Sequence, residues 1–397
     1  MKSSIIKVLL AIAATAALPA VASATQTIAH RGVFHDVSDQ YALSENSLLS
    51  IIRAKNMGLA GVELDLRLSS DGVVMVTHDQ ISNRTTRFDG SGNHKYDPID
   101  GLTGWRPHAS WINQMKAGEL DRALLKAYGR DGRLMEWDQE HINDANRAWN
   151  MHTLDTMFTL LKKYRSDVVS DHNFKIILDI QDADVFQKAA KVVNDHGLRD
   201  YVYLKFFVSR GLWNDPRYHG SETCYEYARE HGLSGMKIIP QINDGELDGN
   251  EDDEAGINAF QTRLTVHDFL QCWSDAQAQH GDAAQMPIVS ASVPKDNEKA
   301  TRAAATALHW ASQHHRQTMS IIPNPDAGRM TGSGSCQTYT WQSTEVVPAK
   351  FNYDARMAKQ HFVDSVKPDY VIVDIMGDNS GNSWKSDLWS FEQNLCR

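Results

Sequence analysis

Short apolar runs recur along most of the chain and alternate with amphipathic segments. Continuous apolar runs of this length are typical of parallel strands that are covered on both faces. The pattern predicts nine strands, at residues 27–30, 61–66, 73–78, 174–180, 201–207, 236–242, 287–292, 318–322 and 370–375.

The segments between these runs have the periodicity of helices. Residues 45–57 and 184–196 are amphipathic, and in 154–164 the apolar residues fall on one helical face: Leu154, Met157, Phe158, Leu161 and Tyr164. Strand–helix alternation over this length predicts an α/β fold, either a closed TIM (β/α)8 barrel or a large open sheet. Because a barrel has eight positions for nine candidates, we expect 287–292 or 236–242 to lie outside it.

Two stretches interrupt the alternation. Residues 83–150 are polar and rich in Gly, Trp and Asp, with one predicted helix at 110–128, and residues 243–256 are strongly acidic. Loops of this length in a compact domain are usually functional. We therefore interpret 83–150 as a long insertion after the third strand.

The N-terminus has the pattern of a secretory signal peptide over residues 1–24. Lys2 and Lys7 precede an apolar stretch at 8–21, and Ala22-Ser23-Ala24 forms a cleavage site of small residues. An uncleaved N-terminal anchor is the alternative. We expect a mature domain at 25–397, periplasmic or secreted, with no transmembrane segment after cleavage.

The net charge and the cysteine spacing argue against nucleic-acid binding and against a zinc site. The net charge of −10 argues against a protein that binds nucleic acid through a basic face. The four cysteines lack the spacing of a zinc site, and in an exported protein they are candidates for disulfides. Proximity in the sequence favours Cys224 with Cys272 and Cys336 with Cys396, and buried free thiols are the alternative.

Candidate chemistry lies on the first three predicted strands. Glu63 and Asp65 are two residues apart, so on a strand they project from the same face, where two desolvated carboxylates need a cation between them. Oxygen ligands suit Mg²⁺ or Ca²⁺. His30 and His78 each end a predicted strand, and two histidines beside a metal, with Arg31 next to one, suit the acid/base cleavage of a phosphodiester.

These motifs resemble those of the glycerophosphodiester phosphodiesterase family. The similarity rests on an ordered series of segments: Ala29-His30-Arg31-Gly32, Ser44-Glu45-Asn46-Ser47, Gly61-Val62-Glu63-Leu64-Asp65-Leu66-Arg67, Ser70-Asp71-Gly72 and His78-Asp79. Weaker likeness continues in Arg84-Thr85-Thr86, Thr153-Leu154-Asp155 and the last strand at 370–374.

The resemblance implies a TIM barrel that hydrolyses a small-molecule glycerophosphodiester to an alcohol and glycerol 3-phosphate with one divalent cation. His30 and His78 would be the acid/base pair, and Arg31 would contact the phosphate. Glu63 and Asp65 would ligate the metal. Glu45 would support a catalytic group, and Asn46 would cap a helix or brace a loop.

The chain departs from the family at the fourth strand, where the family has Glu-x-Lys. Asp179 takes the place of the metal-ligating Glu, and Gln181 replaces the phosphate-binding Lys. Lys205, in a buried strand, is the predicted replacement on the phosphate, with Lys237 as a weaker candidate.

Two other functions remain open from the sequence. One is a sphingomyelinase D-like barrel that cleaves phospholipid headgroups, with a groove built from four tryptophans, Trp105, Trp111, Trp137 and Trp149. The other is a catalytically silent phosphate-binding barrel, which the loss of the family Lys at Gln181 suggests.

Overall fold

The computed structural model describes more than half of the chain. It describes residues 25–34, 43–80, 82, 85–86, 111–127, 149–180, 183–207, 223–242, 266–292, 298–322, 327–330, 336–342, 345–349 and 362–374. The predicted signal peptide, the acidic stretch 243–256, and Arg84, Gln181, Trp105, Trp137 and Cys396 lie outside these residues.

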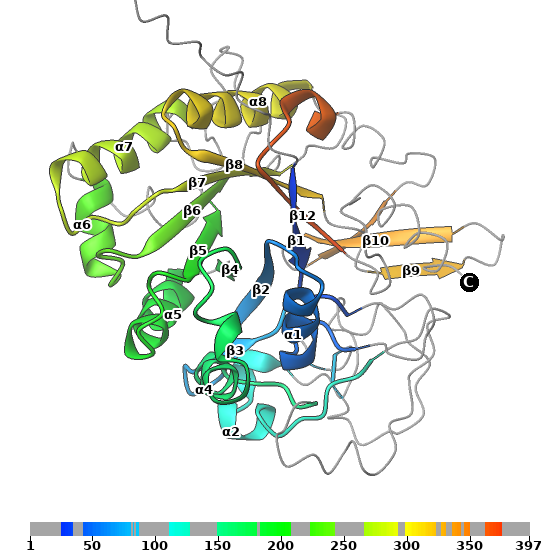
Figure 1. The fold of residues 1–397 in the computed structure, drawn as a ribbon. Coiled ribbons are helices and arrows are strands. Elements are labelled where there is room, and N and C mark those ends of the chain that lie inside the picture. The colour runs from blue at the N-terminus through cyan, green and yellow to red at the C-terminus, as the bar shows by residue number, and fades with distance from the viewer. Residues whose placement is uncertain are drawn as a thin grey trace, which may run out of the picture.

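Eight parallel strands close into a barrel (Figure 1). In spatial order they run β1, β12, β8, β7, β6, β5, β4 and β2, and the pairing of β1 with β2 closes the ring. This closure confirms the TIM barrel and excludes the open sheet. The strands are β1 (Gln26–His30), β2 (Gly61–Leu68), β4 (Lys175–Ile180), β5 (Val202–Phe207), β6 (Lys237–Ile242), β7 (Ile288–Ser292), β8 (Gln317–Ile322) and β12 (Tyr370–Val373).

Helices surround the strands (Figure 1) and cover their outer face. They are α1 (Leu48–Asn56), α4 (Leu154–Tyr164), α5 (Ala183–Asp195), α6 (Thr223–Glu230), α7 (Val266–Gln279) and α8 (Glu298–Gln313). Helix α4 buries Leu154, Met157, Phe158 and Leu161 as predicted, whereas Tyr164 in its last turn is exposed. No helix in the described part of the chain is long and apolar enough to cross a membrane.

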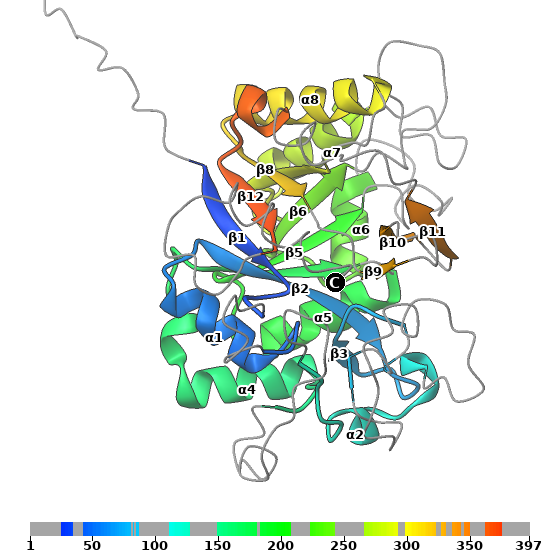
Figure 2. The ribbon, with the colours of Figure 1, turned by 90° about the vertical axis from the view of Figure 1, so that its right-hand side faces the viewer.

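Of the nine predicted strands, the one outside the barrel is β3 (Val74–Val76), so the expectation that 287–292 or 236–242 would be excluded is wrong. β3 pairs antiparallel with the distal end of β2, Leu66 opposite Val76 and Leu68 opposite Val74 (Figure 2). The reason is the length of the link. Parallel neighbours need a crossover of a dozen or more residues, and the few residues after β2 can form only a hairpin.

The long segment after β3 forms short pieces where it is described. A 3-10 helix at Ile112–Gln114 and α2 (Ala117–Leu120) replace the predicted helix at 110–128. A helix cannot continue through this segment, because Leu124 forms an isolated β-bridge with Asn150 and Leu125 forms one with Thr86. Later in the chain, β9 (Ala327–Met330), β10 (Cys336–Gln342) and β11 (Glu345–Ala349) form a separate antiparallel sheet.

The barrel interior is apolar toward the amino-terminal ends of the strands. A cluster of nine buried residues fills it: Ile28, Ile177, Tyr203, Ile239, Ile288, Met319, Ile321, Tyr370 and Ile372. The ammonium of Lys175 lies 4.4 Å from the centre of the Tyr370 ring, and that of Lys237 lies 5.3 Å from that of Tyr203.

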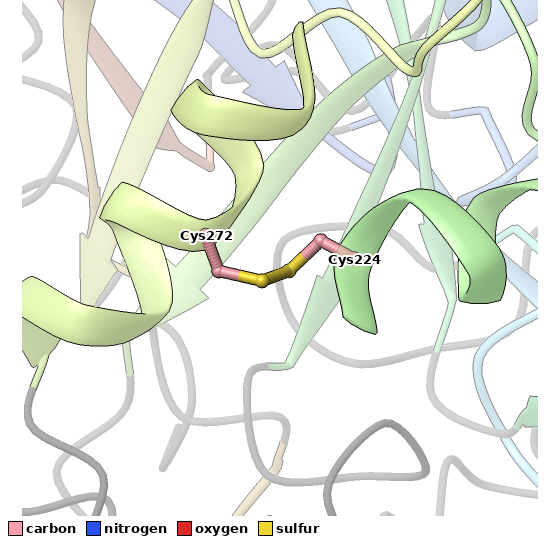
Figure 3. Close-up of a disulfide and its surroundings, with 2 residues drawn as sticks. All are labelled: Cys224 and Cys272. Carbon is pink, nitrogen blue, oxygen red and sulfur yellow. A yellow bond between two sulfur atoms is a disulfide. The ribbon is translucent and has the colours of Figure 1, made fainter. Parts of the chain in front are cut away.

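A disulfide joins Cys224 on α6 to Cys272 on α7, with their Cα atoms 5.9 Å apart (Figure 3). The first predicted pair is confirmed. The second prediction, Cys336 with Cys396, lies outside the described side chains.

Candidate active site

Three carboxylates meet inside the barrel, two from the middle of β2 and one from near the carboxyl end of β4. Glu63 and Asp65 project from the same face of β2, and Asp65 lies in register with Asp179 on β4. One oxygen from each of the three lies within 4.8 Å of the others, and all three side chains are buried. We refer to Glu63, Asp65 and Asp179 as the acidic cluster.

The acidic cluster fits a hard divalent cation. Glu63 Oε2 is buried and has no hydrogen-bond partner among the residues that the structure describes. Burial raises the pKa of Glu63, and the nearby carboxylates add to this rise against the opposing charge of Lys205. A bound cation would relieve both the unpaired oxygen and the repulsion, and an all-oxygen donor set suits Mg²⁺ or Ca²⁺.

Asp65 is the most firmly held member of the acidic cluster. Its Oδ2 lies 3.1 Å from Arg31 Nε and accepts a hydrogen bond of 3.0 Å from Asn46 Nδ2. Burial alone would raise its pKa, but Arg31 and, to a lesser degree, His78 and His30 hold the pKa of Asp65 far below its usual value. Asp65 is therefore a fixed negative charge.

Asn46 is a loop brace. Its φ of 53° lies in the left-handed region that Asn tolerates, and its Oδ1 accepts the backbone N–H of Asp65 at 3.0 Å. The cap of helix α1 is Ser47, whose Oγ accepts the N–H of Ser50. Of the two roles predicted for Asn46, the structure supports the brace.

His30 lies at the end of β1, next to the residue that follows β12. Because Ala29 pairs with Val373 in parallel register, the next residue of each strand is also adjacent, and His30 Nδ1 lies 2.9 Å from Asp374 Oδ1. Burial by itself lowers the pKa of this imidazole, but the Asp374 carboxylate outweighs it and raises the pKa of His30 to about 9. His30 is therefore protonated at neutral pH.

His78 reaches the same end of the barrel through the β2–β3 hairpin. The chain returns along β2, and the N–H of Thr77 donates to the carbonyl of Asp65 at 2.9 Å. His78 Nδ1 lies 2.9 Å from Asp79 Oδ1, and Arg67 Nε donates to the His78 carbonyl at 2.8 Å. The hairpin thus delivers His78 to the mouth, although the residue does not end a barrel strand.

Arg31 and Glu45 lie at the edge of the acidic cluster. Arg31 Nη1 is 3.5 Å from Glu45 Oε1, so one guanidinium contacts both Glu45 and Asp65. The backbone here is tightly turned, with φ of 58° at Arg31 and 81° at Gly32. A Cβ at Gly32 would collide with Ser50, so this position requires glycine.

Lys205 faces the barrel interior and contacts carboxylates. Its Nζ lies 3.1 Å from Glu63 Oε1 and 3.1 Å from Asp179 Oδ1, and these charges raise its pKa against the effect of burial. The phosphate contact expected of Lys205 stays a prediction. Lys237, the other candidate, begins β6 and donates to the Asp200 carbonyl, so the structure does not bring it to the acidic cluster.

Comparison with known proteins identifies the family resemblance. Residues 30–216 match the model of the Glycerophosphoryl diester phosphodiesterase family. The resemblance drawn from the motifs is confirmed.

Individual relatives match over short segments. Glycerophosphodiester phosphodiesterase 1 of Rattus norvegicus is 48% identical over 65 residues, which is 16% of this chain and 17% of the rat protein. Glycerophosphodiester phosphodiesterase of Caldanaerobacter subterraneus is 39% identical over 66 residues, 17% of this chain and 25% of the relative. The matched parts thus span a quarter or less of these two relatives.

Among solved structures, a glycerophosphoryl diester phosphodiesterase from Parabacteroides distasonis aligns with a TM-score of 0.46. It is 14% identical, and the alignment covers 89% of this chain and 84% of that one.

Sequence reasoning assigned no role to two polar partners at this site. Asp374 and Asp79 orient the two histidines. A signal existed for Asp374, because it directly follows the last barrel strand and so lies at the mouth. The pairing with His30 spans 344 positions along the chain, which no local pattern encodes.

Proposed function

We propose that this chain is a metal-dependent phosphoric diester hydrolase that converts glycerophosphodiesters to an alcohol and glycerol 3-phosphate. One observation carries the proposal. Two histidines at the barrel mouth are each held through Nδ1 by a carboxylate, beside a buried cluster of three further carboxylates. Each imidazole then presents Nε2 as the nitrogen that can meet a substrate, which is the arrangement that acid/base cleavage requires.

The two histidines divide the proton transfers. His30, whose pKa Asp374 raises to about 9, holds a proton at neutral pH and gives it to the leaving alcohol oxygen. His78 takes the proton of the glycerol hydroxyl next to the phosphate as that hydroxyl attacks phosphorus, and Asp79 stabilises the imidazolium that results. The alcohol leaves with the proton from His30, and water then opens the cyclic phosphate to give glycerol 3-phosphate. Both roles follow from geometry and charge, since a general acid must be protonated at the pH where the enzyme works.

The acidic cluster would hold one divalent cation, Mg²⁺ or Ca²⁺. When bound, the cation supplies positive charge that neutralises the phosphoryl oxygens. Arg31 lies at the rim of the cluster and supplies further positive charge, while Asn46 keeps Asp65 oriented. Glu45 fixes the Arg31 guanidinium from its other side.

The protein is exported to a periplasm or beyond. The signal-peptide pattern at residues 1–24 supports this location, and so does the disulfide between Cys224 and Cys272. Disulfides persist in oxidising compartments and are rare in reducing ones.

The test is hydrolysis of glycerophosphocholine by the purified chain, followed as choline release. We expect turnover that a chelator abolishes and that Mg²⁺ or Ca²⁺ restores. His78→Ala should lower the rate at least about 100-fold. His196→Ala is the matched control, because His196 also pairs with an aspartate, Asp155, but follows helix α5 outside the barrel.

Two outcomes would contradict the proposal. Activity confined to intact phospholipid vesicles would indicate headgroup cleavage. Of the four tryptophans predicted to line a groove for that reaction, the structure describes Trp111 and Trp149, and both are half-buried. Binding of glycerophosphocholine without turnover would indicate a silent phosphate-binding barrel.

A further inference from the structure

A buried lysine already neutralises part of the acidic cluster. The side chain of Lys205 is 1% exposed, and its ammonium lies 3.1 Å from an oxygen of Glu63 and 3.1 Å from an oxygen of Asp179. A lysine buried to this extent requires anionic partners, and this one has two. Two of the three candidate metal ligands therefore hold a cation that belongs to the chain itself.

The strand register explains why Lys205 reaches the acidic cluster. β4 and β5 are parallel neighbours, and Asp179 lies directly opposite Lys205. Across β4, Asp179 is in register with Asp65 of β2. The three strands thus place Asp65, Asp179 and Lys205 in one row on the inner face of the barrel.

The charges of the acidic cluster are divided between two cations. Arg31 and Asn46 hold Asp65, whereas Lys205 holds Glu63 and Asp179. Each carboxylate of the acidic cluster thus has a cationic partner, whereas Oε2 of Glu63 has no hydrogen-bond partner among the described residues.

We propose that Lys205 is a resident counter-cation of the acidic cluster, which keeps Glu63 and Asp179 together in the metal-free chain and competes with the divalent cation for them. This inference rests on the proposed metal centre. An ammonium cannot ligate a metal ion, and it repels one at close range, so its presence weakens metal binding. The ion pairs of Lys205 with Glu63 and Asp179 also keep the barrel mouth folded when no metal is bound.

The experiment is thermal unfolding of chelator-stripped protein at increasing Mg²⁺ and, separately, Ca²⁺. Lys205→Met keeps the length and apolar body of the side chain and removes its charge. Without metal, K205M should melt well below the parent chain because three buried carboxylates then face one another. Added metal should raise its melting temperature with a half-maximal concentration at least tenfold lower than in the parent chain.

The matched control is Lys237→Met. Lys237 also faces the barrel from a strand, but it lies at the amino-terminal end and contacts Tyr203 and the Asp200 carbonyl. The half-maximal metal concentration of K237M should equal that of the parent chain. A shift in K237M as large as in K205M would overturn the proposal, because it would reflect the loss of any barrel lysine.

The outcomes distinguish the counter-cation role of Lys205 from the existence of the metal centre. If the parent chain responds to metal and K205M has the same half-maximal concentration, the counter-cation role is wrong and the metal centre stands. If neither chain responds to metal, the metal centre fails, and the competition fails with it. Should K205M not fold, Lys205→Gln takes its place, and failure of both variants to fold at saturating metal also overturns the proposal, since the metal should replace the missing charge.

Discussion

The pairing of His30 with Asp374 should make the stability of the protein depend on pH, and Asp374→Asn tests this. Asp374→Asn keeps the size of the side chain and an oxygen that can face His30 Nδ1, but it removes the negative charge. Both partners are buried, and the two atoms lie 2.9 Å apart. The change therefore isolates the charge of Asp374 from its packing.

The magnitude follows from the pKa of His30. Burial lowers this pKa, the Asp374 charge reverses the effect, and the result is a rise from 6.5 to about 9. A rise of that size corresponds to about 3 kcal/mol of folding free energy. Because the folded-state pKa is the higher one, this stabilisation is complete below the unfolded value of 6.5 and is lost as the pH rises toward 9.

The assay is urea unfolding of metal-free protein at about pH 6 and again above about pH 9. The loss of unfolding free energy that Asp374→Asn causes should be about 3 kcal/mol larger at the lower pH than at the higher pH. In a His30→Gln background the same change should have no such pH dependence. A difference that stays constant or grows with pH would refute the assignment of the raised pKa to Asp374.

Three further predictions concern the site and the scaffold. His30→Ala and His78→Ala should each lower kcat at least about 100-fold, and the double variant should lose little more, whereas multiplied losses would show independent action. Asn46→Ala removes both hydrogen bonds to Asp65, a proposed metal ligand, and should raise the metal concentration that half-restores activity about tenfold; an unchanged value contradicts the brace. Replacing both cysteines of the α6–α7 disulfide with alanine opens a loop spanning 48 positions and should cost about 4 kcal/mol in urea unfolding. A loss below about 1 kcal/mol would show that the unfolded state is not constrained by the bridge.

The parts of the fold that the sequence predicted are those set by local pattern. Short, mostly apolar runs marked all eight barrel strands, and the spacing of Glu63 and Asp65 placed both carboxylates on one face. The same pattern could not distinguish a barrel strand from β3, because both are short and apolar. The short link between β2 and β3 distinguishes them, because it allows only an antiparallel hairpin and not a parallel barrel neighbour.

The parts that could not be predicted depend on contacts between distant segments. The register between β4 and β5 brings Lys205 to Asp179, and closure of the barrel brings Asp374 to His30. A side chain on the inner face of a barrel can meet any of several strands, so its partner follows from the closed structure. For Lys205, the sequence indicated a buried cation that needs an anion, and the structure supplies two carboxylates.

We propose that the two histidines and the acidic cluster hydrolyse a glycerophosphodiester. Phosphorus NMR of glycerophosphocholine incubated with the purified chain and Mg²⁺ or Ca²⁺ follows this reaction, because substrate and product give separate resonances. We expect the diester signal to be replaced by that of glycerol 3-phosphate, and neither chelator-treated protein nor His78→Ala to produce this change at a comparable rate. An unchanged diester signal with folded, metal-loaded protein, or phosphocholine as the product, would contradict it.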